Sequence, residues 1–133
     1  MSSESEPYRF KGPDKRHFIP RVRQKSITKR INTVIEPWVD VDADVAAINA
    51  GQATRREDDF IINGRTYRTH GGIGQRLIPV EGPGFHQLDR PTYKALGVFN
   101  SFGNTHRAHS ILDNMGITTP QRQLALEVWR LGQ

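Results

Sequence analysis

Two histidines and two arginines of this chain could together carry out RNA cleavage. Arg68 and His70 fall on one face of a predicted hairpin, and a Gly-Pro-Gly turn could bring His86 and Arg90 to the same end of the sheet. One imidazole would take the 2′-OH proton, the other would protonate the leaving oxygen, and arginine would neutralise the phosphorane. The set predicts, as an alternative function, a metal-independent, toxin-like ribonuclease. The competing interpretation is that each histidine only caps a turn.

The first quarter of the chain holds the excess positive charge. Residues 1–35 carry nine basic and three acidic residues, a net of +6, whereas residues 36–133 carry ten basic and eleven acidic residues, a net of −1. This asymmetry is typical of a basic arm that binds a polyanion. The residues predicted to contact nucleic-acid phosphates are Lys15, Arg16, Arg21, Arg23, Lys25, Lys29 and Arg30.

We therefore expect a nucleic-acid-associated binding module rather than an enzyme, with RNA or DNA as its partner. An acidic protein surface would attract the same arm. An arm that threads into a second copy or another partner would instead make the protein a structural or assembly component and a homo-oligomer. The charge pattern implies neither sequence-specific readout nor a membrane partner, and it leaves the choice between RNA, DNA and protein open.

Three further patterns resemble ligand-binding motifs without matching them. The acidic run 40–44 lacks the glycine and the glutamate that a calcium loop needs later in its sequence. His106, His109 and Asp113 share a helix face, but that face is opposite the apolar stripe and should be solvated. The glycine run 71–74 fits neither the dinucleotide fingerprint nor the P-loop. We expect no metal and no cofactor.

The clearest structural signal is a β-hairpin. Asn63-Gly64 lies between two β-rich runs and predicts a two-residue type I′ turn. That register places Phe60 opposite Tyr67, an aromatic pair on one face. Residues 76–80 form a predicted third strand, and Pro79 places it at an edge.

Helix signals surround this hairpin. Asp42 or Asp44 is the predicted N-cap of a short helix before it. Three helices should follow it, capped by Asp89, by Asn104 or Thr105, and by Thr119. The predicted core consists of Phe60, Ile62, Tyr67, Leu77, Val80, Leu96, Phe99, Ile111, Leu112, Leu124, Val128 and Trp129.

Together these elements predict an α+β fold, with a small antiparallel sheet of about three strands packed on a C-terminal three-helix group. Residues 1–35 are expected to form a basic extended or disordered arm, and residues 36–133 a single α+β domain. The chain has no cysteine, which excludes disulfides and thiolate sites and fits the cytoplasm. Its polar N-terminus is unlike a secretory signal, and no apolar run approaches the roughly 20 residues of a membrane span.

Overall fold

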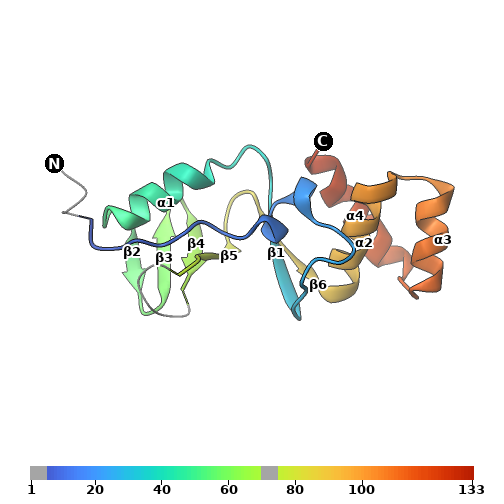
Figure 1. Cartoon of the computed structure of the whole chain (residues 1–133), viewed down its shortest axis with the longest axis horizontal. Helices are drawn as coiled ribbons and strands as arrows, with labels where there is room; N and C mark the ends of the chain where they lie inside the picture. The colour runs from blue at the N-terminus through green and yellow to red at the C-terminus, as the bar shows by residue number, and fades with distance from the viewer. Residues whose placement is uncertain (1–5, 70–74) are drawn as a thin grey trace. The chain divides into compact units, whose positions relative to one another are not determined.

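The computed structural model describes residues 6–69 and 75–133. The chain is α+β, as predicted, with sheets of four and two strands and four α-helices among the described residues. It divides into two compact units, each assembled from two separate segments. Unit 1 comprises residues 1–14 and 38–85, and unit 2 comprises residues 15–37 and 86–133. Figure 1 gives the labels of the helices and strands.

Unit 1 contains an antiparallel sheet in the order β2-β3-β4-β5. The predicted hairpin is confirmed, because Phe60 pairs with Tyr67 and both turn residues, Asn63 and Gly64, have positive φ. Pro79 lies on the last strand of the sheet, as expected. Strand β2, the first in this sheet, was not predicted from the sequence. The strands are β2 (Thr54–Arg56), β3 (Asp59–Ile62), β4 (Arg65–Arg68) and β5 (Ile78–Glu81).

Helix α1 (Val41–Asn49) packs against β3 in unit 1. Its N-cap is Asp40, whose carboxylate accepts a hydrogen bond from the Ala43 amide at 3.0 Å. The prediction of Asp42 or Asp44 as the cap was therefore wrong by two or four residues. Because the helix begins earlier, Asp44 lies one turn inside it, where it is fully buried.

The N-terminal segment of unit 1 is attached to this core. Phe10 is buried, and its backbone exchanges hydrogen bonds of 2.8 and 3.1 Å with the side chain of Asn49 at the end of α1. Its ring packs against those of Tyr8 and Phe60. The Lys11 carbonyl accepts from the amide of Leu77. Residues 8–11 thus contribute to the fold of unit 1.

Unit 2 contains β1 (Ile31–Ile35) and three helices, and β1 pairs with β6 (Phe85–Asp89), of which all residues but Phe85 belong to unit 2. These helices are α2 (Arg90–Phe102), α3 (His106–Asn114) and α4 (Thr119–Leu131). Asp89 and Thr105 are the N-caps of α2 and α3, as predicted. The N-cap of α4 is Thr118, one residue before the predicted Thr119, and it forms a capping box with Gln121. Helix α2 packs against α3, α4 and β1.

The core prediction is partly confirmed. Seven of the expected residues are buried: Phe60, Tyr67, Leu77, Leu96, Phe99, Leu112 and Val128. Ile62, Val80, Ile111 and Trp129 are half-buried. Leu124 was wrongly placed in the core, since it is 43% exposed on α4. Leu124 precedes Val128 by one helical turn, but only Val128 is buried.

Residues 15–30, called the basic segment below, include core residues that the charge pattern does not indicate. Ile19 and Val22 are fully buried in unit 2, where they pack with Val34 of β1. Two short 3₁₀ helices, η2 (Lys15–His17) and η3 (Ile19–Arg21), carry the chain through this region. The boundary expected at residue 35 therefore differs from the division seen here, which separates residues 1–14 from residues 15–37. In the part of the chain that is described, no helix has both the length and the apolar character of a membrane span.

Candidate nucleic-acid interface

The positive charge of the protein belongs to unit 2. Residues 15–37 and 86–133 hold twelve basic and four acidic residues, a net of +8. Residues 1–14 and 38–85 hold seven basic and ten acidic residues, a net of −3. All seven residues predicted to contact phosphates lie in unit 2. A polyanion should therefore be attracted to this unit.

Helix α2 holds the basic segment through polar side chains. The Tyr93 hydroxyl donates to the Arg16 carbonyl at 2.6 Å. The Asn100 amide donates to the carbonyls of Ile19 and Val22 at 2.7 and 2.9 Å. Because the two α2 side chains are seven residues apart, they lie on the same helix face. The backbone of residues 16–22 is thus fixed at three points.

Gly97 lies between these two side chains on the same face of α2. It allows the backbone of the basic segment to approach the helix closely. A Cβ atom at this position would lie 2.5 Å from the carbonyl carbon of Arg23 and 2.6 Å from the nitrogen of Gln24. No side chain fits there unless the segment moves. Gly97 is therefore the residue that lets the backbone of the basic segment rest directly on α2.

The segment then forms a turn stabilised by its own side chains. The Ser26 amide donates to the Arg23 carbonyl at 3.0 Å, and the Arg23 amide donates to Oγ of Ser26 at 2.9 Å. The Arg23 guanidinium donates to the carbonyls of Pro20 and Val22, both at 2.9 Å. The orientation of this arginine is therefore set by the backbone, with further N–H donors left for a ligand.

Four of the predicted residues surround a hollow of about 380 Å³ next to this turn. Its lining consists of Lys15, Arg21, Arg23, Lys25 and Ser26. The described residues that line it include no carboxylate, and none of its four cations forms an ion pair with a described residue. Cationic donors around a concave surface, with a hydroxyl among them, suit a phosphate group. We call this hollow the basic pocket.

The other three predicted residues lie outside the basic pocket. Lys29 and Arg30 are exposed just before β1, in a turn that Asn32 holds by two hydrogen bonds of 2.8 Å to the Lys29 backbone. Arg16 is half-buried on η2, where its carbonyl accepts from Tyr93.

A second hollow of about 420 Å³ lies at the start of α2 and α4. Arg90, Pro91 and Lys94 line it from α2, and residues 115–118 and 121 line it from the α3–α4 connection and α4. Arg90 belongs to the predicted catalytic set, and no pattern in the sequence indicates this hollow. We call it the mixed pocket, because cationic, apolar and amide side chains share its lining.

The four residues of the ribonuclease hypothesis are distributed over the two units. Arg68 belongs to unit 1, where Nε lies 2.7 Å from the Asp59 carboxylate, and that hydrogen bond raises the pKa of Arg68. His86 and Arg90 belong to unit 2, and Nε2 of His86 lies 2.9 Å from the Glu36 carboxylate. His70 is outside the described residues. The catalytic arrangement stays a prediction.

Two of the three residues predicted to share a face of α3, His109 and Asp113, have protein partners. His109 bonds Asn104 through Nε2 at 2.8 Å, and its ring packs on Phe99. Asp113 forms an ion pair of 2.6 Å with Arg122. Within residues 6–69 and 75–133, no group of three or more histidines or acids could hold a metal ion.

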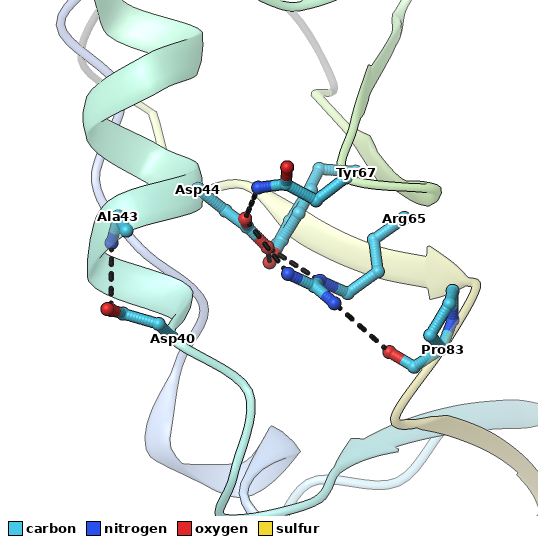
Figure 2. Close-up of polar contacts among 7 residues, drawn as sticks. Asp40, Ala43, Asp44, Arg65, Tyr67 and Pro83 are labelled. Carbon is cyan, nitrogen blue, oxygen red and sulfur yellow. Dashed lines mark hydrogen bonds and ion pairs between the residues drawn. The ribbon is translucent and has the colours of Figure 1, made fainter.

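Unit 1 contains the most buried charge network that the structure describes. The Arg65 guanidinium contacts both carboxylate oxygens of Asp44, at 2.7 and 3.1 Å (Figure 2). Tyr67 donates to the same carboxylate at 2.6 Å, and Asn63 donates at 2.8 Å. Arg65 also reaches the Pro83 carbonyl at 3.5 Å. The network joins α1, β4 and the turn before β6.

The protonation states in this network follow from its geometry. Burial by itself would raise the pKa of Asp44, but the hydrogen bonds from Arg65, Tyr67 and Asn63 outweigh burial and hold it below its ordinary value. Burial, followed by the hydrogen bond to Asp44, raises the pKa of Tyr67. At neutral pH the network is a carboxylate bound by a cation and a neutral phenol. Each of its buried side-chain nitrogen and oxygen atoms has a hydrogen-bond partner, so the network stabilises the fold and leaves no polar group for a reaction.

Comparisons of the chain with protein-family models, with curated proteins and with solved structures found no match. The features of the molecule that bear on function are the two pockets of unit 2 and the charges around them.

Proposed function

We propose that this protein binds nucleic acid through phosphate contacts made by unit 2. The observation that carries the proposal is the basic pocket, in which Lys15, Arg21, Arg23 and Lys25 surround one hollow without a neutralising carboxylate among its described lining. The four cations are exposed, so water and salt screen most of their mutual repulsion, and all four are accessible to an anion that enters the hollow. A nucleic-acid backbone supplies such anions at regular intervals.

The attachment of the basic segment to α2 supports the same proposal. The hydrogen bonds from Tyr93 and Asn100 and the close approach at Gly97 order the backbone before any ligand arrives. A ligand that binds a preformed loop does not have to offset the entropy of ordering it. Phosphate contacts position a nucleic acid without reading its sequence, so the basic pocket itself supports no base specificity.

The test is the salt dependence of binding to a fluorescent oligonucleotide. Affinity should fall steeply as salt rises, and the slope should become shallower by about one for each phosphate contact removed. The variant Lys15→Gln/Arg21→Gln/Lys25→Gln should lose at least roughly tenfold in affinity and show the shallower slope. The control Arg56→Gln/Arg107→Gln/Arg130→Gln removes three exposed charges outside both pockets and should have a much smaller effect.

The same measurement separates other partners. Equal binding to RNA, DNA and a simple anionic polymer at matched charge would indicate a general polyanion site. Tight, salt-dependent binding to an acidic protein with none to nucleic acid would overturn the proposal in favour of a protein partner. Equal losses in the two triple variants would also overturn it. The cytoplasm stays the proposed compartment, supported by the absence of cysteine from the sequence.

A further inference from the structure

The two pockets of unit 2 adjoin one another. Gln24 lies between two lining residues of the basic pocket, and its amide reaches the sulfur of Met115 at 3.9 Å. Met115 in turn lines the mixed pocket. This contact joins the rims of the two hollows.

Helix α2 contacts the segment that forms the basic pocket and also lines the mixed pocket. The backbone of Arg23 rests on Gly97, and the mixed-pocket residues Lys94 and Arg90 precede that glycine by three and seven positions. Residues with this spacing lie along one helix face, at rises of about 4.5 and 10.5 Å from Gly97. The cations Arg90 and Lys94 of the mixed pocket therefore start within about 10.5 Å, along the helix axis, of the point where Arg23 rests on α2.

The chemistry of the mixed pocket differs from that of the basic pocket. Pro91, Met115 and Ile117 give it apolar surface, while Arg90 and Lys94 give it charge. Apolar surface beside cations suits a nucleobase with its phosphate, because the base faces are apolar and the backbone is anionic.

Gln121 adds a hydrogen-bond donor to this pocket. Its Oε1 accepts from the Thr118 amide at 2.9 Å, which sets the orientation of the side-chain amide. Nε2 then donates to no residue that the structure describes. An NH₂ group held in this way can pair with acceptors on the edge of a base.

We propose that the ligand of unit 2 is a single-stranded nucleic acid, whose backbone passes through the basic pocket while one unstacked nucleotide enters the mixed pocket. This inference rests on the proposed function. A duplex keeps its bases stacked and paired, and therefore could offer the mixed pocket no base. A single strand can turn a base out of line at little cost.

The first experiment compares a labelled RNA of about 12 nucleotides, within the range that one small domain engages, with a duplex of the same sequence. The single strand should bind at least about tenfold more tightly. The variant Arg90→Gln/Lys94→Gln should weaken single-strand binding several-fold more than the control Arg107→Gln/Arg130→Gln, which removes two charges of unit 2 outside both pockets. Thermal melts of all variants check that unit 2 remains folded.

The second experiment tests the base itself. Gln121→Glu keeps an acceptor for the capping box but removes the amide donor. It should weaken binding of the RNA more than binding of an abasic strand of the same length, because the abasic strand reports only the effect of the added negative charge.

The outcomes distinguish the two proposals. If the Lys15/Arg21/Lys25 variant loses binding while the Arg90/Lys94 variant behaves like its control, phosphate binding stands and the inference about the mixed pocket is wrong. Equal affinity for duplex and single strand, or an equal effect of Gln121→Glu on intact and abasic strands, also overturns the inference. If neither charge variant changes binding, both proposals are wrong.

Discussion

The two units differ in net charge and in the surroundings of several of their cations. In unit 1, with a net charge of −3, Arg65 and Arg68 are each paired with a carboxylate of the same unit. In unit 2, with a net charge of +8, Lys15, Arg21 and Lys25 surround a hollow and form no ion pair with any described residue. Paired charges stabilise a fold and leave little for a ligand, whereas unpaired charges on a fixed backbone are available for binding.

This contrast can be tested because each unit contains one tryptophan, Trp38 in unit 1 and Trp129 in unit 2. The indole N–H signals in a ¹H–¹⁵N spectrum therefore report on the two units separately. A variant that affects one unit should shift or broaden one signal more than the other.

Removal of residues 1–30 should have the largest effect. Ile19 and Val22 are fully buried in unit 2, and truncation of a buried aliphatic side chain to alanine alone costs about 1–5 kcal/mol. With a typical total stability of roughly 5–15 kcal/mol, we expect unit 2 to lose its cooperative melt. Circular dichroism and the Trp129 signal provide the measurement. A truncated protein that melts as sharply as the full chain would restore the expectation of a separate arm.

Asp44→Ala should have a large effect confined to unit 1. It leaves the buried Arg65 guanidinium without its carboxylate, which costs about 3–5 kcal/mol. Chemical denaturation followed through Trp38 should show this loss, and oligonucleotide binding by unit 2 should be unchanged in buffer where unit 1 remains folded. A drop in oligonucleotide affinity there would contradict the separation of roles.

The difference between wild type and Asp44→Ala also depends on pH. Because the folded state holds the pKa of Asp44 below its ordinary value of 3.8, the carboxylate contributes its full stability above that value. The contribution is lost as pH falls through the lowered pKa of the folded state. Wild type and variant should therefore converge in stability in acid, in melts recorded from neutral pH to below pH 3.8.

Gly97→Ala should have the smallest effect on stability and a clear effect on binding. The added methyl group collides with the backbone of Arg23 and Gln24, at a cost of about 1–3 kcal/mol as the segment shifts. Displacement of the turn separates the cations of the basic pocket, so affinity should fall several-fold although no charge has been removed. Gly12→Ala in unit 1 is the control, since a Cβ placed there makes only an ordinary contact of 3.7 Å with Val45 and the residue lines neither pocket. Unchanged affinity in Gly97→Ala would show that the position of the segment does not matter for binding.

Local signals in the sequence were sufficient for the hairpin and for the N-caps of α2 and α3. Asn63-Gly64 specifies its turn through the positive φ of two adjacent residues, and the strand register follows from that turn. Asp89 and Thr105 cap their helices through hydrogen bonds to residues three positions away. The N-cap of α1 was misplaced because three aspartates stand close together, and only packing distinguishes Asp40, which is exposed, from Asp44, which is buried.

By itself, the sequence determined the α+β class, the hairpin register and the candidate phosphate-binding residues, because periodicity, turn chemistry and charge are properties of neighbouring residues. Only the tertiary structure decided that Ile19 and Val22 belong to the core, that Gly97 supports the basic segment, and that Asp44 binds Arg65. These features depend on contacts between residues that are far apart in the sequence. Asp44 and Arg65 are 21 positions apart, and Val22 and Asn100 are 78 positions apart. Such contacts are set by complementary shape and by the need to satisfy buried polar groups, and neither can be read from composition.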